Sequence, residues 1–273
     1  MSPLTLVFIV AGAVSAACWI ASLITRDTSW VDRIWSVVPV AYVWIFAGAT
    51  DFTDIRLLVM AGLVTLWGAR LTFNFARKGG YTGVEDYRWA VLRARMSPAA
   101  FQVFNLLFIV LFQNALLALI TLPALTALEN PVPYGPWDAV LTALFLAALV
   151  GETVADQQQW NFHRWKAAET AAGREARPRF LQTGLWRTSR HPNFFFEQAQ
   201  WWIFFLMGAV AAGSVLVWTV AGAVLLTCLF IGSTAFTESI TRGKYPEYAE
   251  YQARVSPIVP WWPRRRTAGA RVA

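Results

Sequence analysis

The chain has few of the side chains that bind metal ions or form disulfide frameworks. Its 273 residues include only two histidines and two cysteines, and both cysteines, Cys18 and Cys228, lie within long apolar runs. A thiol in such a run behaves as a small hydrophobic group, and two histidines are too few to complete the coordination of zinc or haem iron. The sequence therefore predicts neither a disulfide scaffold nor a metal centre.

Charge is also scarce. Charged residues make up 14% of the chain and hydrophobic residues 57%, with a mean hydropathy of +0.45. An ordinary globular domain is far less apolar, and a membrane-spanning helix needs roughly 20 consecutive apolar residues. We therefore expect an all-α, polytopic integral membrane protein. Its seven transmembrane helices are predicted at residues 3–25, 34–48, 57–76, 100–123, 137–160, 194–212 and 215–236.

The basic residues lie almost entirely in alternate connections between these runs. Of the 23 lysines and arginines, all but Arg56 and Arg70 fall in the first, third and fifth loops or after the last run. By the positive-inside rule, the N-terminus is predicted outside and the C-terminus in the cytoplasm. The first run lacks a charged leader and a small-residue cleavage site, so it is read as a retained helix. Because the apolar runs separate the basic residues, no nucleic-acid partner is predicted.

We expect residues 1–273 to form one membrane domain, since no stretch resembles an interdomain linker. The fifth loop, residues 162–191, and the C-terminal segment, residues 237–263, are long and rich in aromatic side chains. Long loops are usually functional or disordered, and the aromatic content favours order. These two segments are predicted to form a cytoplasmic cap. The basic tail Arg264–Arg266 is predicted to contact lipid headgroups.

Polar side chains recur at helical spacing near the cytoplasmic ends of the fifth and sixth runs. Ionisable groups at membrane depth usually face a helix-bundle interior or a wet cavity, so the two stripes are expected to converge beneath the fifth loop. Interhelical hydrogen bonding alone is the alternative explanation. Arg70, within the third run, also needs a carboxylate, a phosphate or water. The stripes consist of Glu152, Asp156, Gln159 or Trp160, and His163 on the fifth run and of Asn193, Glu197 and Gln200 on the sixth.

The fifth loop is rich in arginine. Guanidinium groups match the geometry of phosphate, which makes a phosphate-bearing nucleotide a natural ligand. No Gly-x-Gly-x-x-Gly motif follows a strand, so a nucleotide site here is not a Rossmann site. The arginines are Arg164, Arg174, Arg177, Arg179, Arg187 and Arg190.

The run Gly184–Phe194 (GLWRTSRHPNF), followed by Glu197 and Trp201–Trp202, resembles the signature of the steroid 5-alpha-reductase-like membrane proteins, in particular their bacterial branch of uncharacterised function. Residues 155–162 and 244–260 are similar to that family's neighbouring motifs. The resemblance implies seven helices with an outer N-terminus, in a multi-pass protein of the bacterial inner membrane. It also implies NADPH-dependent reduction of a carbon–carbon double bond conjugated to a carbonyl, in a steroid-like or other lipid.

The resemblance also implies the roles of individual residues. In the family's steroid reductases, a Glu on the second span and a Tyr on the third polarise the substrate ketone. Asp32 aligns with the Glu, the Tyr position falls near Trp67, and Tyr87 is the nearest phenol. Asp32 and Tyr87 are therefore the predicted catalytic pair. The predicted NADPH contacts are Arg70, Asp156, His163, Arg164, Arg179, Arg190, His191, Asn193, Glu197 and Tyr248.

Two other functions are compatible with parts of the sequence. Membrane methyltransferases that use S-adenosylmethionine to modify lipids or isoprenylcysteine share an Arg-His-Pro turn. There an aromatic and then a small residue follow the turn and leave room for the cofactor. Here Asn193, three phenylalanines and Glu197 follow, which favours the reductase. A channel or transporter is expected to have Gly- or Pro-broken helices in matching halves, and the sequence shows no such pattern.

Overall fold

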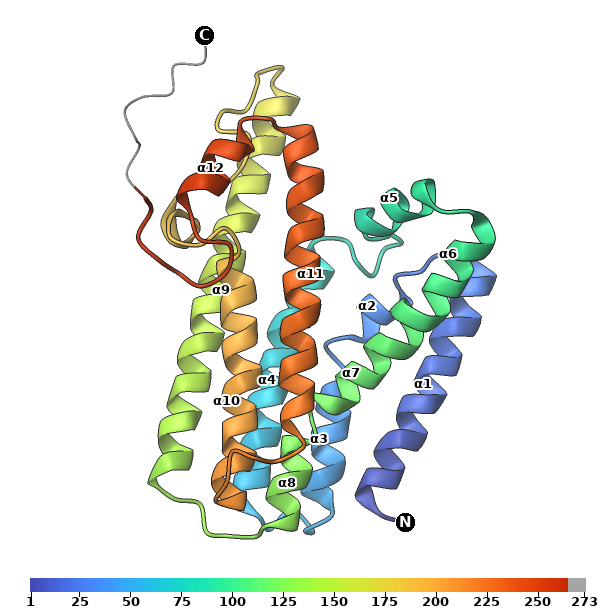
Figure 1. Ribbon diagram of the computed structural model, residues 1–273, viewed down its shortest axis with the longest axis vertical. Coiled ribbons are helices and arrows are strands. Elements are labelled where there is room, and N and C mark those ends of the chain that lie inside the picture. The colour runs from blue at the N-terminus through green and yellow to red at the C-terminus, as the bar shows by residue number, and fades with distance from the viewer. Residues whose placement is uncertain (265–273) are drawn as a thin grey trace. The chain divides into compact units, whose positions relative to one another are not determined.

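A computed structural model describes residues 1–264 (Figure 1), so Arg265 and Arg266 of the predicted headgroup-binding tail lie outside the described residues. The described chain is helical and contains no strand, only an isolated bridge between Ser189 and Ser256. The predicted all-α class is confirmed. The elements are α1 (Pro3–Thr25), α2 (Trp30–Ile34), α3 (Val38–Gly48), α4 (Ile55–Arg77), α5 (Tyr87–Arg95), α6 (Pro98–Phe104), the π-helix η1 (Asn105–Phe112), α7 (Gln113–Leu119), α8 (Pro123–Glu129), α9 (Pro136–Ala171), the 3₁₀ turn η2 (Gly184–Arg187), α10 (Pro192–Ala212), α11 (Val220–Lys244) and α12 (Tyr248–Arg254).

Five helical stretches of the described chain are long and apolar enough to cross a membrane, in agreement with a multi-pass protein. Two of the seven expected spans differ from them. Helix α3 has 11 residues and is about 16 Å long, shorter than a bilayer core. Helix α10 has 21 residues, but its first turns carry Glu197, Gln198 and Gln200, which lower its apolar content. Seven spans and their orientation stay predictions. The five stretches are Pro3–Thr25, Ile55–Arg77, Pro98–Glu129, Pro136–Ala171 and Val220–Lys244.

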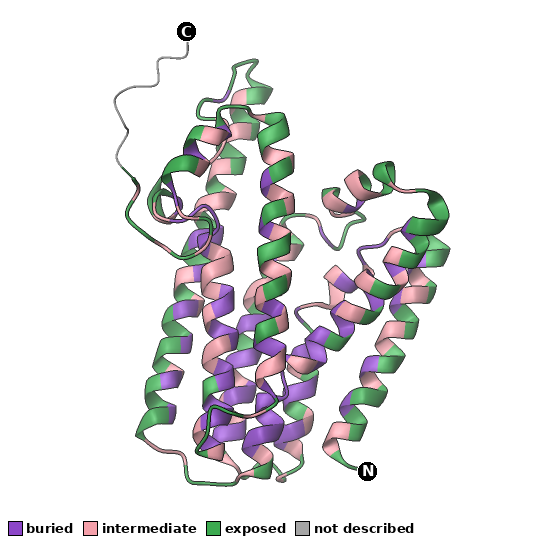
Figure 2. Cartoon of the chain, viewed as in Figure 1, coloured by how far each residue is buried: buried purple, intermediate pink, exposed green. Residues whose placement is uncertain are grey.

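Helix α1 shows the side-chain distribution expected of a helix in contact with lipid. Its N-terminus is capped by Ser2, whose Oγ accepts a 3.1 Å hydrogen bond from the Thr5 amide. Few of its residues are buried (Figure 2), while large aliphatic side chains such as Ile20 and Ile24 are exposed. A water-soluble protein rarely exposes such a continuous apolar surface, so this face fits a lipid environment.

The described chain forms two compact units, each assembled from two stretches of sequence. The first unit comprises Met1–Leu146 and Trp201–Thr227, and the second comprises Ala147–Gln200 and the chain from Cys228 onward. In the first unit, Gly68 of α4 lets α3 and the turn before it approach closely, because a Cβ there would lie 2.5 Å from the Ser36 carbonyl oxygen and 2.7 Å from Val40 Cγ2.

A buried ion pair in the first unit accounts for Arg56, one of the two exceptions to the charge pattern. Its Nε and Nη2 each donate a 2.7 Å hydrogen bond to the carboxylate of Asp138, and only about 2% of either side chain is exposed. Arg56 also donates to the carbonyls of Val132 and Pro133. A guanidinium in an apolar region needs such compensation.

The second unit contains η2, α12, and the parts of α9, α10 and α11 that fall within its two stretches. The turn η2 is held against α9, where the Trp186 indole donates to the Ala155 carbonyl over 3.2 Å and the Leu185 amide donates to Gln158 Oε1 over 3.0 Å. Gly184 has a left-handed φ of 63°, and a Cβ there would lie 2.5 Å from the Gln158 amide. Glycine is therefore favoured at the start of this turn.

Candidate functional site

Helices α9 and α10 bring the two predicted polar stripes face to face within the second unit. Gln200 Nε2 donates a 2.6 Å hydrogen bond to Glu152 Oε2, and both side chains are buried. Close helix packing supports this contact, because a Cβ at Gly151 would lie 2.5 Å from the Phe196 ring. Asp156 and Glu197 occupy the next positions of their stripes and are buried too. The stripes therefore form a buried carboxylate and carboxamide surface.

Two carboxamide oxygens on α10 have no hydrogen-bond partner among the described residues. They are Oδ1 of Asn193 and Oε1 of Gln200, and both atoms are buried. Thr234 Oγ1, on α11 in the same unit, is in the same state. Buried acceptors in proteins nearly always receive a hydrogen bond, so a buried acceptor without a protein donor is expected to bind a ligand or a water molecule. The stripe of α10 thus offers acceptors to an N–H or O–H donor.

The motif residues Arg190 and His191 converge on one carboxylate, that of Glu238 on α11. Arg190 Nε and Nη2 donate to the two oxygens of Glu238 over 2.5 and 2.9 Å, and His191 Nε2 lies 3.1 Å from Glu238 Oε1. Gln252 Nε2 and the Tyr248 hydroxyl donate to the same carboxylate over 2.9 and 3.3 Å. We call these five side chains the Glu238 cluster.

The Glu238 cluster also fixes the C-terminal segment of the described chain. Arg190 Nη1 donates to the carbonyls of Gln252 and Val255, and the Arg190 amide donates to the Ser256 carbonyl over 2.8 Å. Most of the donors of Arg190 are therefore committed inside the protein. Its predicted contact with a cofactor phosphate requires release of Glu238 or a bond from the remaining N–H. Burial raises the pKa of the Tyr248 and Tyr251 phenols, which stay neutral donors.

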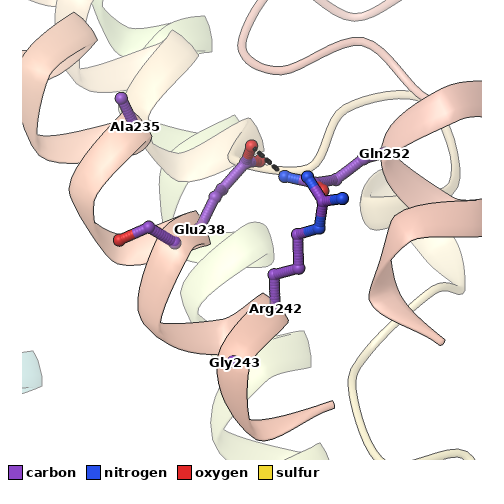
Figure 3. A pocket seen from close by; sticks show the side chains of 6 residues that line it. Ala235, Glu238, Arg242, Gly243 and Gln252 are labelled. Carbon is purple, nitrogen blue, oxygen red and sulfur yellow. Dashed lines mark hydrogen bonds between the residues drawn. The ribbon is translucent and has the colours of Figure 1, made fainter. Parts of the chain in front are cut away.

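Glu238 and Gln252 also line an open pocket of about 610 Å³ (Figure 3), beside Arg242 of α11. Sequence reasoning did not select Glu238. The available signal was a carboxylate near the end of an apolar helix, a position where an ionisable group is costly unless it has a partner or a function.

The arginines of the fifth loop differ in their surroundings. Arg179 pairs with Glu175 and lies 3.5 Å from Glu247, while Arg174 and Arg177 pair with Glu169 and Glu175. Arg164 and its neighbour His163 are exposed at the far part of α9, and Arg187 is exposed at the end of η2. The exposed pairs are weak, so a phosphate can replace a carboxylate there.

Asp32, the predicted acid, lies on α2 in the first unit. Its Oδ2 accepts a 3.1 Å hydrogen bond from the indole of Trp89. Burial raises the pKa of Asp32, and nearby Asp86 adds to the rise, while Trp89 and Arg88 oppose it. Arg33 instead turns to Asp27 over 2.5 Å and to the Gly80 carbonyl over 3.1 Å. The environment of Asp32 therefore favours the protonated form.

The other predicted residues of the first unit lie in different settings. Tyr87, at the start of α5, is 53% exposed, and Trp89 is the α5 residue that reaches Asp32. Residues two apart do not share a helix face, so Tyr87 is directed elsewhere. Arg70 is partly buried on α4, and Trp67 is fully buried, edge-on to Trp201 at 4.9 Å. Sequence reasoning also missed Tyr42, a fully buried phenol on α3 whose hydroxyl has no hydrogen-bond partner among the described residues.

Within residues 1–264, no three His, Cys, Asp or Glu side chains lie close enough together to hold a metal ion.

Comparison with known proteins places the chain in a family. Residues 18–255 match the family described as "protein of unknown function (DUF1295)". The chain belongs to the DUF1295 family. DUF1295 is related to the steroid 5-alpha-reductase-like proteins, which agrees with the resemblance of the 184–194 motif.

One relative of the chain comes from a yeast. An uncharacterised protein of the fission yeast Schizosaccharomyces pombe is 39% identical over 262 residues, which cover 89% of this chain and 75% of that protein. The expected bacterial branch is thus too narrow a description of the family, and the type of membrane stays a prediction. No solved structure matches the chain significantly.

Proposed function

We propose that this DUF1295 protein is an NADPH-dependent membrane reductase. Its reaction is the reduction of a carbon–carbon double bond conjugated to a carbonyl, in a steroid-like or other lipid substrate. One observation carries the proposal: the buried stripes of α9 and α10 include acceptor oxygens, above all Asn193 Oδ1, that no described residue satisfies. The motif that contains Asn193 is the one that resembles the steroid 5-alpha-reductase-like proteins.

The donor and acceptor set fits NADPH. A nicotinamide carboxamide and ribose hydroxyls are hydrogen-bond donors, which suit the oxygens of Asn193, Asp156 and Glu197. Phosphates suit accessible guanidiniums such as those of Arg164, which is exposed, and Arg179, which is half-buried. When bound, NADPH supplies a hydride to the β carbon of the conjugated substrate.

The protein's part in the reaction is to orient the substrate and to supply a proton. Asp32, whose pKa is raised by its desolvated setting, donates a proton to the substrate carbonyl oxygen as negative charge develops there, and it regains a proton from water. The hydride and this proton give the enol of the substrate, which tautomerises to the saturated carbonyl as the oxygen loses a proton to water and the α carbon gains one. Tyr42 is a second candidate donor, because its phenol is buried and its hydroxyl is unsatisfied by the described residues. These features make it a better candidate than the exposed Tyr87.

The packing around Phe194 favours the reductase over the methyltransferase alternative. The Phe194 ring stacks on His191 at 5.2 Å and meets Phe230 edge-on at 4.6 Å. These rings fill the space next to the Arg-His-Pro turn that the methyltransferases leave open for their cofactor. S-adenosylmethionine therefore serves as the comparison ligand in the test.

The binding test uses the purified protein in a neutral detergent and titrates NADPH by fluorescence and calorimetry. We expect saturable binding that Asn193→Ala weakens up to about tenfold, the effect of one buried hydrogen bond, and that Arg179→Ala also weakens. Asn161→Ala is the matched control, because Asn161 is an exposed carboxamide on α9. Binding of S-adenosylmethionine without any binding of NADPH would overturn the proposal.

The activity test follows NADPH consumption with a panel of conjugated lipid ketones and aldehydes. Asp32→Asn is expected to lower kcat strongly with little change in NADPH affinity. Tyr42→Phe and Tyr87→Phe form a matched pair, since each removes one hydroxyl. A loss of kcat confined to Tyr87→Phe would reassign the phenol donor to Tyr87.

A further inference from the structure

A second pocket of the second unit is lined by positive charge and aromatic surface. It has a volume of about 510 Å³, and its walls include no carboxylate. One wall is the segment that follows α12, residues 256–264, which we call the C-terminal strap. The lining residues are Gln182, Arg187, Tyr251, Arg254, Val255, Trp262, Pro263 and Arg264.

The walls of this pocket are held in place by hydrogen bonds to the strap. Ser189 Oγ donates to the Ile258 carbonyl over 2.6 Å, and the Trp261 amide donates to the Thr188 carbonyl over 2.9 Å. The Arg264 amide donates to the Arg254 carbonyl over 2.9 Å, which closes the other side. The pocket is therefore a built feature of the fold.

Three arginines of the pocket differ from those of the fifth loop. Arg174, Arg177 and Arg179 each pair with a carboxylate. Arg187, Arg254 and Arg264 are exposed and form no ion pair with any residue between 1 and 264. Three like charges around one cavity repel one another, so the arrangement favours an anionic ligand.

The position along α9 indicates where this pocket lies relative to lipid. Trp186 and Leu185 dock on Ala155 and Gln158 of α9. These residues lie about 20 positions after the start of α9, or about 30 Å at 1.5 Å per residue, which is one hydrocarbon thickness. Helix α9 is long and apolar enough to span a membrane, and Trp137 at its start is exposed. A bilayer that α9 enters at its first turn would therefore have its second surface at the level of the docked turn η2.

The strap has the composition of a segment at such a surface. Trp261 and Trp262 are 71% and 80% exposed, and Val259 is exposed as well. Tryptophan concentrates at the headgroup level of membranes, and arginine there attracts anionic lipids. A soluble anion explains the guanidiniums but leaves the exposed tryptophans without a role.

We propose that this pocket binds the phosphate headgroup of an anionic phospholipid. Arg187, Arg254 and Arg264 contact the phosphate, and Trp262 packs against the glycerol and upper acyl region of the same lipid. Arg265 and Arg266, outside the described residues, are not needed for the proposal. The site is independent of the proposed reductase activity.

Native mass spectrometry of the full chain in neutral detergent tests this site. The probes are dioctanoyl phosphatidylglycerol and, as the zwitterionic comparison, dioctanoyl phosphatidylcholine. We expect preferential binding of phosphatidylglycerol. Arg187→Gln, Arg254→Gln and Arg264→Gln should each weaken it about fivefold, the effect of one basic residue at an anionic surface. Combining the three should remove the preference.

Arg177→Gln is the matched control, because it removes one exposed positive charge outside the pocket. It should leave lipid binding unchanged, and thermal unfolding without lipid should show that all variants are folded. Equal loss with Arg177→Gln, or no loss with the pocket variants, overturns the proposal. Competition by NADPH overturns it in favour of a nucleotide site, and competition by inorganic phosphate alone in favour of a soluble anion.

Discussion

The replacement Glu238→Gln tests whether the Glu238 cluster fastens the C-terminal segment. The substitution keeps the size of the side chain and removes its charge. Arg190 and Glu238 are both buried, so the loss leaves a buried guanidinium without its counter-ion. We expect the segment from α12 through the strap to separate from η2 more often.

The size of the effect follows from the hydrogen bonds of the cluster. Removal of one partner of a buried ion pair costs about 3–5 kcal/mol. In the glutamine variant one acceptor oxygen remains, and an NH₂ group replaces the other. Arg190 and Gln252 both donate to one oxygen of Glu238, so the NH₂ group places a donor opposite a donor. A destabilisation of about 3 kcal/mol corresponds to a rise of roughly 100-fold in the population of the open segment.

Hydrogen exchange read by mass spectrometry measures this opening directly. Peptides that cover residues 245–264 should lose protection, because the amides of Val255, Trp261 and Arg264 are hydrogen-bonded in the closed segment. Glu247→Gln is the control: it removes the same charge from an exposed pair with Arg179 and should change stability by less than about 1 kcal/mol. Unchanged protection in Glu238→Gln, or equal loss in Glu247→Gln, would refute the reasoning.

Two further predictions concern the first unit. Arg56→Met leaves the buried carboxylate of Asp138 without its partner and should lower the stability in detergent by about 3–5 kcal/mol. Arg93→Gln is the control: it breaks an exposed pair with Glu85 and should cost at most about 1 kcal/mol. Equal shifts of the two variants in thermal unfolding would contradict this prediction. Because the pKa of Asp32 is raised in the folded state, the folded protein binds that proton more tightly than the unfolded chain does, and the free energy of unfolding should fall as the pH rises from about 3.9 towards the raised value. Asp32→Asn keeps an acceptor for Trp89 and should lack this part of the pH dependence, so identical stability profiles for wild type and variant would count against the assignment.

The all-α fold and the polar stripes could be predicted from the sequence because both depend on local periodicity. A residue at i and another at i+4 share a helix face wherever the helix packs, so Glu152 and Asp156, or Asn193 and Glu197, could be assigned to one face each. The Gln200–Glu152 hydrogen bond shows that these faces meet. Span number was less predictable, since the apolar run at 34–48 includes a turn and only the 11 residues of α3.

The partners of individual charges could not be predicted, because they come from distant parts of the chain. The contact between Asp32 and Trp89 joins residues 57 apart, and that between Arg190 and Glu238 joins residues 48 apart. In the sequence Arg33 is the cation next to Asp32, and an adjacent cation would oppose protonation of the carboxyl. In the folded unit Arg33 is drawn to Asp27, which leaves burial as the dominant influence on Asp32.

The residues of the Arg-His-Pro-Asn motif have two different roles, although they are adjacent in the sequence. Pro192 begins α10, so Arg190 and His191 precede the helix and reach Glu238, while Asn193 and Glu197 continue into the helical stripe. Arg190 therefore acts on the C-terminal segment, and Asn193 carries the unsatisfied acceptor. A variant at Arg190 that weakens NADPH binding should do so together with loss of hydrogen-exchange protection in α12 and the strap. Asn193→Ala should weaken NADPH binding while that protection is retained. If both variants change binding and protection in the same proportion, the motif performs one task, and Arg190 belongs to the cofactor site itself.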